Sequence, residues 1–182
     1  MHEGVYEALQ DKGALFPTGY GKMAYSGMLA DVFHALDDFF KQHCMDMGAQ
    51  QELYPPALEG ESLLRAGYFS TLAQHAYFVA PLKTSLDSLQ AARDGDLFKT
   101  SGEGHLQVPN WVLSPTVCHH CFEARKDSAI ELPLKVTAIN QCSRYEVHDT
   151  RGMERLRMYW MREFIQFDVE QKKVVESLDK LL

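Results

Sequence analysis

Five residues near the end of the chain combine side-chain types that bind nucleotides. Arg144 and Glu146 lie two positions apart in one strand-like run, and Arg155, Tyr159 and Glu163 follow at spacings of four in the next. Because strand side chains alternate between faces, residues two or four apart point the same way. If the two runs pair as a hairpin, one sheet face gathers all five. Arginine forks bind phosphate oxygens, a carboxylate can accept from an adenine amino group, and a ring can stack on the base.

The same pattern also fits a plainer interpretation. The connection from His148 to Met153 is rich in turn-forming residue types. A solvated, charge-laced β-hairpin would carry the same side chains, and surface ion pairs are common and contribute little to stability. Composition alone favours this plainer interpretation, so residue types and spacing leave both open.

The surrounding segments predict an α+β domain built on an antiparallel sheet. Residues 26–47 form the clearest helix, because apolar residues recur along one helical face and Gly48 can end it. Two long runs, 134–146 and 156–167, predict paired strands, and Asp168 is expected to cap a final helix. The shorter elements are helices over 2–12, 58–66, 85–93 and 116–125, strands over 51–54, 75–80 and 111–113, and loops over 15–22 and 94–104.

Length and charge narrow the class of protein. A chain of 182 residues fits one domain with a sizeable core. The formal net charge of −7 gives no bulk sign of a nucleic-acid binder, which usually has a basic face. No apolar run suits a membrane span or a signal peptide, so the cytoplasm is the expected location. Four cysteines are too few for a disulfide-stapled scaffold, which leaves reduced thiols or metal ligands.

Several ordered segments resemble the catalytic core of the seryl-tRNA synthetases, a class II family. There, L-x-P-T-x-E leads to L-P-L-K-x-x-A and C-x-R-x-E, and here the letters run LSPTVCHHCFEARKDSAIELPLKVTAINQCSRYE. The next segment, DTRGMERLRMYWMREF, resembles the second half of motif 2, and the helix at 26–47 followed by ELYPP resembles motif 1. The resemblance spans about residues 15–168 and implies a class II synthetase-like antiparallel sheet flanked by helices. It also implies amino-acid activation with ATP and Mg²⁺, and a homodimer through residues 26–56.

One departure from the seryl pattern concerns zinc. Cys118 stands where the standard family has the glutamate of T-x-E. This resembles the archaeal zinc-dependent seryl-tRNA synthetases and the amino acid–carrier protein ligases, in which this cysteine, a motif 2 glutamate and a later cysteine hold Zn²⁺. Cys118 and Glu163 match the first two ligands, and both are accepted zinc ligands. A separate structural site in the C-x-x-C of Cys118 and Cys121 is disfavoured because it lacks a second pair, and Cys121 is expected to be a buried apolar residue.

Of these two relatives, the carrier-protein ligases look more similar. The segments LFPTGYGKMAYSG, LLRAGYF and MREF support this, and no tRNA-binding arm is visible. The resemblance implies transfer of a small amino acid, glycine or alanine, to the phosphopantetheine thiol of a carrier protein, and tRNA is not the expected acceptor.

The resemblance also assigns roles. Arg144 is the expected catalytic residue, holding the α-phosphate by positioning and electrostatics. Glu146 would bind the adenine amino group, Arg155 the outer phosphates, and Tyr159 would lie near the adenine ring. Nothing resembles the glycine-rich motif 3, so residues 1–182 are expected to form the N-terminal part of one catalytic domain, incomplete at its C-terminus. Two alternatives remain: a fragment of a zinc-dependent seryl-tRNA synthetase, and a non-catalytic module for binding or dimerisation.

Overall fold

The computed structural model describes residues 3–100, 102–146 and 153–181. In chain order the elements are α1 (Glu3–Asp11), β1 (Leu15–Gly19), β2 (Lys22–Tyr25), α2 (Met28–Asp46), β3 (Gln50–Glu52), β4 (Ala57–Glu59), α3 (Gly60–Arg65), α4 (Tyr68–Thr71), the 3₁₀ helix η1 (Ala73–His75), β5 (Phe78–Val79), α5 (Leu86–Arg93), α6 (Asp96–Lys99), β6 (Trp111–Leu113), α7 (Cys118–Glu123), β7 (Leu134–Ser143), β8 (Met158–Phe167) and α8 (Gln171–Asp179).

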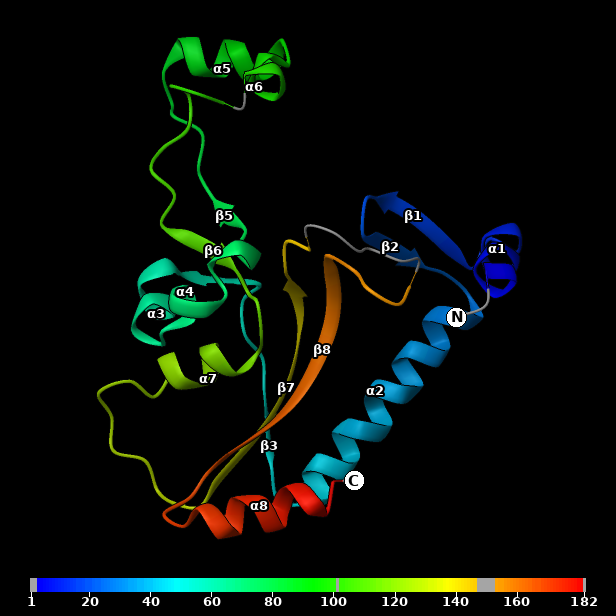
Figure 1. Cartoon of the computed structure of the whole chain (residues 1–182), viewed down its shortest axis with the longest axis vertical. Coiled ribbons are helices and arrows are strands. Elements are labelled where there is room, and N and C mark those ends of the chain that lie inside the picture. The colour runs from blue at the N-terminus through cyan, green and yellow to red at the C-terminus, as the bar shows by residue number, and fades with distance from the viewer. Residues whose placement is uncertain (1–2, 101, 147–152, 182) are drawn as a thin grey trace.

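The central sheet has the strand order β3-β7-β8. β7 and β8 pair antiparallel over ten residues, from Leu134 opposite Phe167 to Ser143 opposite Met158. β3 joins β7 in parallel, so the expected antiparallel pairing is confirmed for the two long strands and one parallel neighbour is added. In Figure 1, α2 and α7 lie on opposite sides of these strands. This is the expected α+β architecture of a sheet flanked by helices.

The long helix α2 is tied to the face of the sheet that carries Trp160 and Arg162. The ring of Phe33 lies 6.0 Å from that of Trp160, and Arg162 Nε donates to Asp37 Oδ1 at 2.5 Å. Gly48, with φ of 85°, follows the helix in a left-handed conformation that favours glycine. Much of the remaining apolar stripe of α2 is exposed, and the homodimer expected through residues 26–56 stays a prediction.

The opening segment differs from expectation. Residues 15–22 were expected to be a loop, whereas the structure forms an antiparallel hairpin of β1 and β2, with Leu15 opposite Tyr25 and Pro17 opposite Met23. Leu15 is buried and anchors the first strand, and Gly21 supplies the positive φ of 67° in the turn. Glycine and proline in this segment predict a loop, but in the structure they belong to the turn and to an edge strand, where both are tolerated.

A second small sheet, β4-β6-β5, supports an arm that projects away from the central sheet (Figure 1). Its core contains Leu58, Leu63, Tyr68 and Val112. The arm is closed by a bridge between Leu82 and Leu106 and carries α5 and α6 at its tip. The expected helix over 58–66 is a strand followed by α3, and the expected loop over 94–104 contains α6.

The final helix begins later than expected. Asp168 Oδ1 accepts from the backbone N–H of Val169 at 2.8 Å and of Glu170 at 3.4 Å, and α8 begins at Gln171. Asp168 therefore organises the turn before α8 rather than capping the helix. Within the described residues, no helix combines the length and apolar character needed to cross a membrane.

Candidate functional site

A cleft of about 340 Å³ lies where β7 ends and β8 begins. Four of the residues singled out in the sequence line it together. The full lining is Arg144, Glu146, Met153, Glu154, Arg155, Leu156, Tyr159 and Met161. Two guanidinium groups, carboxylates and a phenol ring in one concave site form a surface suited to a nucleotide triphosphate.

Arg144 and Glu146 do not reach the cleft through strand alternation. β7 was expected to reach residue 146 but ends at Ser143, so both residues lie in extended chain beyond the strand. The expectation for β8 is closer, because Tyr159, Met161 and Glu163 alternate along the face that α7 covers. The turn-like connection expected between the strands falls largely on residues 147–152, which lie outside the described residues.

Arg144 is held from two sides. Its Nε donates to the carbonyl of Pro115 at 3.0 Å, and its backbone N–H donates to the carbonyl of Arg157 at 3.0 Å. The guanidinium carbon lies 5.8 Å from the centre of the Tyr159 ring, within cation–π range. Burial raises the pKa of Tyr159 to about 12, so its hydroxyl stays protonated at neutral pH.

Glu146 and Arg155 bind each other. Arg155 Nη2 donates to Glu146 Oε2 at 2.7 Å, and the side chain of Glu146 is 12% exposed against 55% for Arg155. The residue expected to bind adenine and the residue expected to bind the outer phosphates therefore form an ion pair. A nucleotide that engages both must exchange this pair for its own contacts.

Glu163 binds the start of α7. Its two carboxylate oxygens accept from the backbone N–H groups of Val117 at 3.2 Å and Cys118 at 2.8 Å. The thiol of Cys118 lies 3.3 Å from Thr116 Oγ1, and burial raises its pKa. A carboxylate near a helix N-terminus satisfies N–H groups that the helix leaves unpaired.

The zinc expectation fits this arrangement only in part. Cys118 and Glu163 are adjacent, yet no group of three histidine, cysteine or acidic residues among the described residues could hold a metal ion. A catalytic zinc usually has three protein ligands. Two ligands, one of which is engaged in helix capping, do not make such a site, so no chemical step is derived through zinc.

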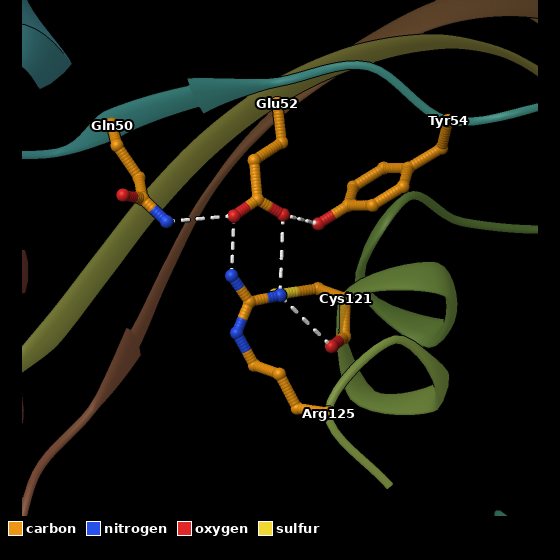
Figure 2. Close-up of polar contacts among 5 residues, drawn as sticks. All are labelled: Gln50, Glu52, Tyr54, Cys121 and Arg125. Atoms are coloured by element: carbon orange, nitrogen blue, oxygen red, sulfur yellow. Dashed lines mark hydrogen bonds and ion pairs between the residues drawn. The ribbon is translucent and has the colours of Figure 1, made fainter. Parts of the chain in front are cut away.

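Cys121 belongs to a network that joins β3 to α7 (Figure 2). The carboxylate of Glu52 accepts from Arg125, Tyr54 and Gln50, and Arg125 Nη1 also donates to the carbonyl of Cys121 at 3.2 Å. Burial raises the pKa of the Cys121 thiol, which is fully covered. Glu52 lies in ELYPP and Arg125 in the segment quoted for the catalytic core, but the motifs assign neither a role, because nothing in the letters shows that residues 73 positions apart meet.

A serine, a histidine and an aspartate meet at the tip of the arm without forming a catalytic triad. Ser88 Oγ lies 3.2 Å from His105 Nδ1, and Asp87 Oδ2 lies 3.6 Å from the same nitrogen. A triad needs the serine and the carboxylate on different ring nitrogens. This group therefore connects α5 to the chain that returns from the tip of the arm.

Comparisons with known proteins bear on the class. No protein-family model matches the chain. It is 27% identical over 169 residues to the type-2 serine–tRNA ligase of Methanopyrus kandleri, covering 79% of this chain and 30% of that protein. A solved complex of M. kandleri SerRS with A. aeolicus tRNASec is similar with a TM-score of 0.84 and 23% identity, over 97% of this chain and 36% of that chain.

Two further solved structures share the fold. The RNA-binding domain of Cryptosporidium parvum threonyl-tRNA synthetase has a TM-score of 0.69 and 16% identity, covering 96% of this chain and 40% of that one. Giardia lamblia prolyl-tRNA synthetase with prolyl-adenylate has a TM-score of 0.74 and 15% identity, covering 96% and 33%. The chain therefore has a class II aminoacyl-tRNA synthetase-like fold. Among these proteins, the M. kandleri serine–tRNA ligase is similar in both sequence and structure.

These comparisons correct the expected acceptor. The similar proteins are tRNA ligases, and one is solved bound to a tRNA, so the expectation of a carrier protein in place of tRNA is wrong. The expectation that the substrate is glycine or alanine rested on the carrier-protein resemblance, so it is withdrawn as well. The chain spans only 30% of the length of the curated relative that it matches. Its acidic net charge is therefore no argument against a tRNA acceptor.

Proposed function

We propose that this domain activates an amino acid with ATP, forming an aminoacyl adenylate. The observation that carries the proposal is the cleft in which Arg144, Glu146, Arg155 and Tyr159 meet, within a class II synthetase-like fold. The sequence motif independently predicts the same four residues as nucleotide ligands. The prolyl-adenylate bound to a structurally similar synthetase agrees with this chemistry.

The reaction is an in-line displacement at phosphorus. An oxygen of the amino-acid carboxylate forms a bond to the α-phosphorus, and the bond to the bridging oxygen breaks, so that pyrophosphate leaves with the electron pair. Arg144, fixed by Pro115 and Arg157, would offer its charge to the α-phosphate as negative charge develops there. Arg155 would neutralise the outer phosphates, and Mg²⁺ on the triphosphate would add positive charge.

The proposed acceptor of the aminoacyl group is tRNA, and serine is the first amino acid to test. Both follow from the name of the M. kandleri relative. Transfer of radiolabelled serine to tRNA is the direct measurement. Labelling with another amino acid would keep the class of reaction and change the substrate.

The adenylate step is tested by calorimetric ATP binding and by serine-dependent exchange of pyrophosphate into ATP. Arg144→Lys keeps the charge but loses the fork, and we expect it to lower exchange by about 100-fold, the usual effect of losing one transition-state donor. Arg65→Lys is the matched control, since Arg65 pairs with Glu61 and Glu123 outside the cleft. Absence of ATP binding would contradict the proposal, and ATP binding without exchange for any amino acid would favour a non-catalytic nucleotide-binding module.

A further inference from the structure

The turn of the β1–β2 hairpin is bound to the first residue of β8 and to the residue before it. The carbonyl of Gly21 accepts from the backbone N–H of Arg157 at 2.7 Å and of Met158 at 3.3 Å. These bonds join residues more than a hundred positions apart, at the edge of the nucleotide cleft. The hairpin is therefore part of the structure around the cleft and not a separate appendage.

The side chain of Arg157 lies between two tyrosine rings. Its guanidinium carbon is 4.4 Å from the ring centre of Tyr20 in the hairpin turn and 4.4 Å from that of Tyr145 beyond β7. Arginine stacks favourably on aromatic faces, and each such contact stabilises the arrangement. The guanidinium also donates from Nε at 3.1 Å and from Nη2 at 2.9 Å to the carbonyl of Glu146.

The segment that carries Glu146 depends on these contacts, because it lies beyond the end of β7 and lacks the sheet ladder. Tyr145 N–H donates to the carbonyl of His75 at 2.9 Å, and His75 Nδ1 lies 3.1 Å from the carbonyl of Tyr145. The next residue, Glu146, has its carbonyl bound by Arg157. Two links from outside the sheet, His75 and Arg157, thus set the path of the chain where the expected adenine-binding side chain begins.

We infer that Tyr20, Arg157 and Tyr145 form a clasp that positions Glu146 and so sets the base preference of the cleft. The inference rests on the proposed nucleotide site and concerns residues that do not line it. The 6-position of adenine presents an amino donor, whereas that of guanine presents an oxygen acceptor. A carboxylate held at a fixed distance accepts a hydrogen bond from the amino group of adenine and repels the oxygen of guanine. If its backbone is released, the carboxylate can move away and the discrimination weakens.

Nucleotide selectivity provides the test, with affinities for ATP, GTP and inorganic tripolyphosphate measured by calorimetry on the whole chain. Arg157→Met keeps the apolar stem but removes the donors and the charge. We expect the ATP-to-GTP affinity ratio to fall at least about fivefold, while tripolyphosphate binding stays within about twofold of the wild type because Arg144 and Arg155 remain. Arg65→Met, outside the cleft, should change none of the three. An unchanged ATP-to-GTP ratio in Arg157→Met would overturn the inference and leave the proposed function standing.

Hydrogen exchange tests the clasp without any nucleotide. In Tyr20→Ala, the amides of Arg157 and Met158 should exchange at least about tenfold faster, since the turn that accepts them is released. Tyr20→Phe keeps the ring and should restore both protection and base selectivity. Unchanged exchange in Tyr20→Ala would show that no clasp exists. If the wild-type chain binds no nucleotide, the proposed function and the base preference both fail, and the exchange measurement still decides whether the clasp is real.

Discussion

At the scale of single residues, the ion pair between Glu146 and Arg155 determines what a ligand must displace. Because Arg155 is more than half exposed, the pair contributes only about 0.2–1 kcal/mol. Glu146→Gln removes the negative charge but keeps an oxygen acceptor of similar shape. Because the ion pair is lost, Arg155 is more available to bind phosphate. We expect tripolyphosphate to bind up to about fivefold more tightly to this variant, as measured by calorimetry at low salt.

The control for this prediction is Glu61→Gln, which removes a carboxylate that pairs with Arg65 outside the cleft. This change lowers the net negative charge equally but leaves the cleft as it is. Tighter tripolyphosphate binding in both variants would mean that overall charge, and not the release of Arg155, is responsible.

Glu163 is a second residue whose role can be separated from metal binding. Its carboxylate accepts from the N–H groups of Val117 and Cys118. A glutamine has only one oxygen acceptor, so its NH₂ group would face one of these two N–H groups. Glu163→Gln should therefore lower the free energy of unfolding by about 1–3 kcal/mol. Urea unfolding in the presence of a strong chelator measures this effect without any metal.

Glu176→Gln, on the exposed side of α8, is the matched control and should be close to neutral. If Glu163→Gln is also neutral in chelator but becomes destabilising when zinc is added, the carboxylate acts as a metal ligand and not as the capping group inferred here.

At the scale of elements, the pair of Glu52 and Arg125 connects β3 to the end of α7, and both side chains are largely buried. Burial alone would raise the pKa of Glu52, but hydrogen bonds from Arg125, Tyr54 and Gln50 bring it below its ordinary value. Glu52→Gln should lower the free energy of unfolding by about 1–3 kcal/mol at pH 7, because Arg125 loses its charged partner.

The pH dependence of this difference has a fixed sign. A carboxyl with a lowered pKa in the folded state stabilises the fold above its unfolded pKa, and this contribution is lost as the pH falls through the folded value. The difference in free energy of unfolding between wild type and Glu52→Gln should therefore be largest at pH 7. It should shrink below about pH 4.3, the ordinary pKa of a glutamate side chain. Urea unfolding across this pH range measures the difference. A difference that grows in acid would contradict the lowered pKa of Glu52.

The elements that the sequence predicts best are those with a sustained period. The predicted helix over 26–47 and the two predicted strands over 134–146 and 156–167 have apolar or alternating residues over ten positions or more. The structure contains all three as α2, β7 and β8. The β1–β2 hairpin was missed because four-residue and five-residue strands carry little periodicity, and their pairing depends on Leu15 and the turn. β7 ends at Ser143 and not at residue 146, because the alternation of side chains continues beyond Ser143 although the strand pairing does not.

The residues of the candidate site also divide into those that the sequence predicts and those that only the structure shows. Arg144, Glu146, Arg155 and Tyr159 could be found because they lie in one continuous motif, and the structure places them in one cleft. Arg157 and Tyr20 could not, since their contact joins the two ends of the chain and depends on a hairpin that was not predicted. The two-ligand geometry at Cys118 was also beyond the sequence, because motif letters do not show that Glu163 meets backbone N–H groups.

At the scale of the whole molecule, charge bears on how the proposed tRNA acceptor is bound. The chain has 25 acidic and 18 basic residues, and it spans 30% of the length of its M. kandleri relative. Binding of a polyanion depends on neutralising phosphates with lysine and arginine, which makes the affinity fall with salt. If the chain charges tRNA as proposed, its acidic balance predicts that it holds tRNA weakly even when it forms adenylate.

We expect the chain to bind labelled tRNA with a dissociation constant weaker than about 1 µM at physiological salt, in the range of non-specific contacts. With only about two phosphates neutralised, the affinity should fall roughly tenfold between 50 and 200 mM salt. Fluorescence anisotropy measures both quantities, and M. kandleri SerRS, which is solved in complex with a tRNA, is the positive control. Sub-micromolar binding by the chain that changes little with salt would contradict this prediction. Such a result would mean that contacts other than phosphate neutralisation, made by this domain itself, recognise the tRNA, and the projecting arm would then be the first surface to mutate.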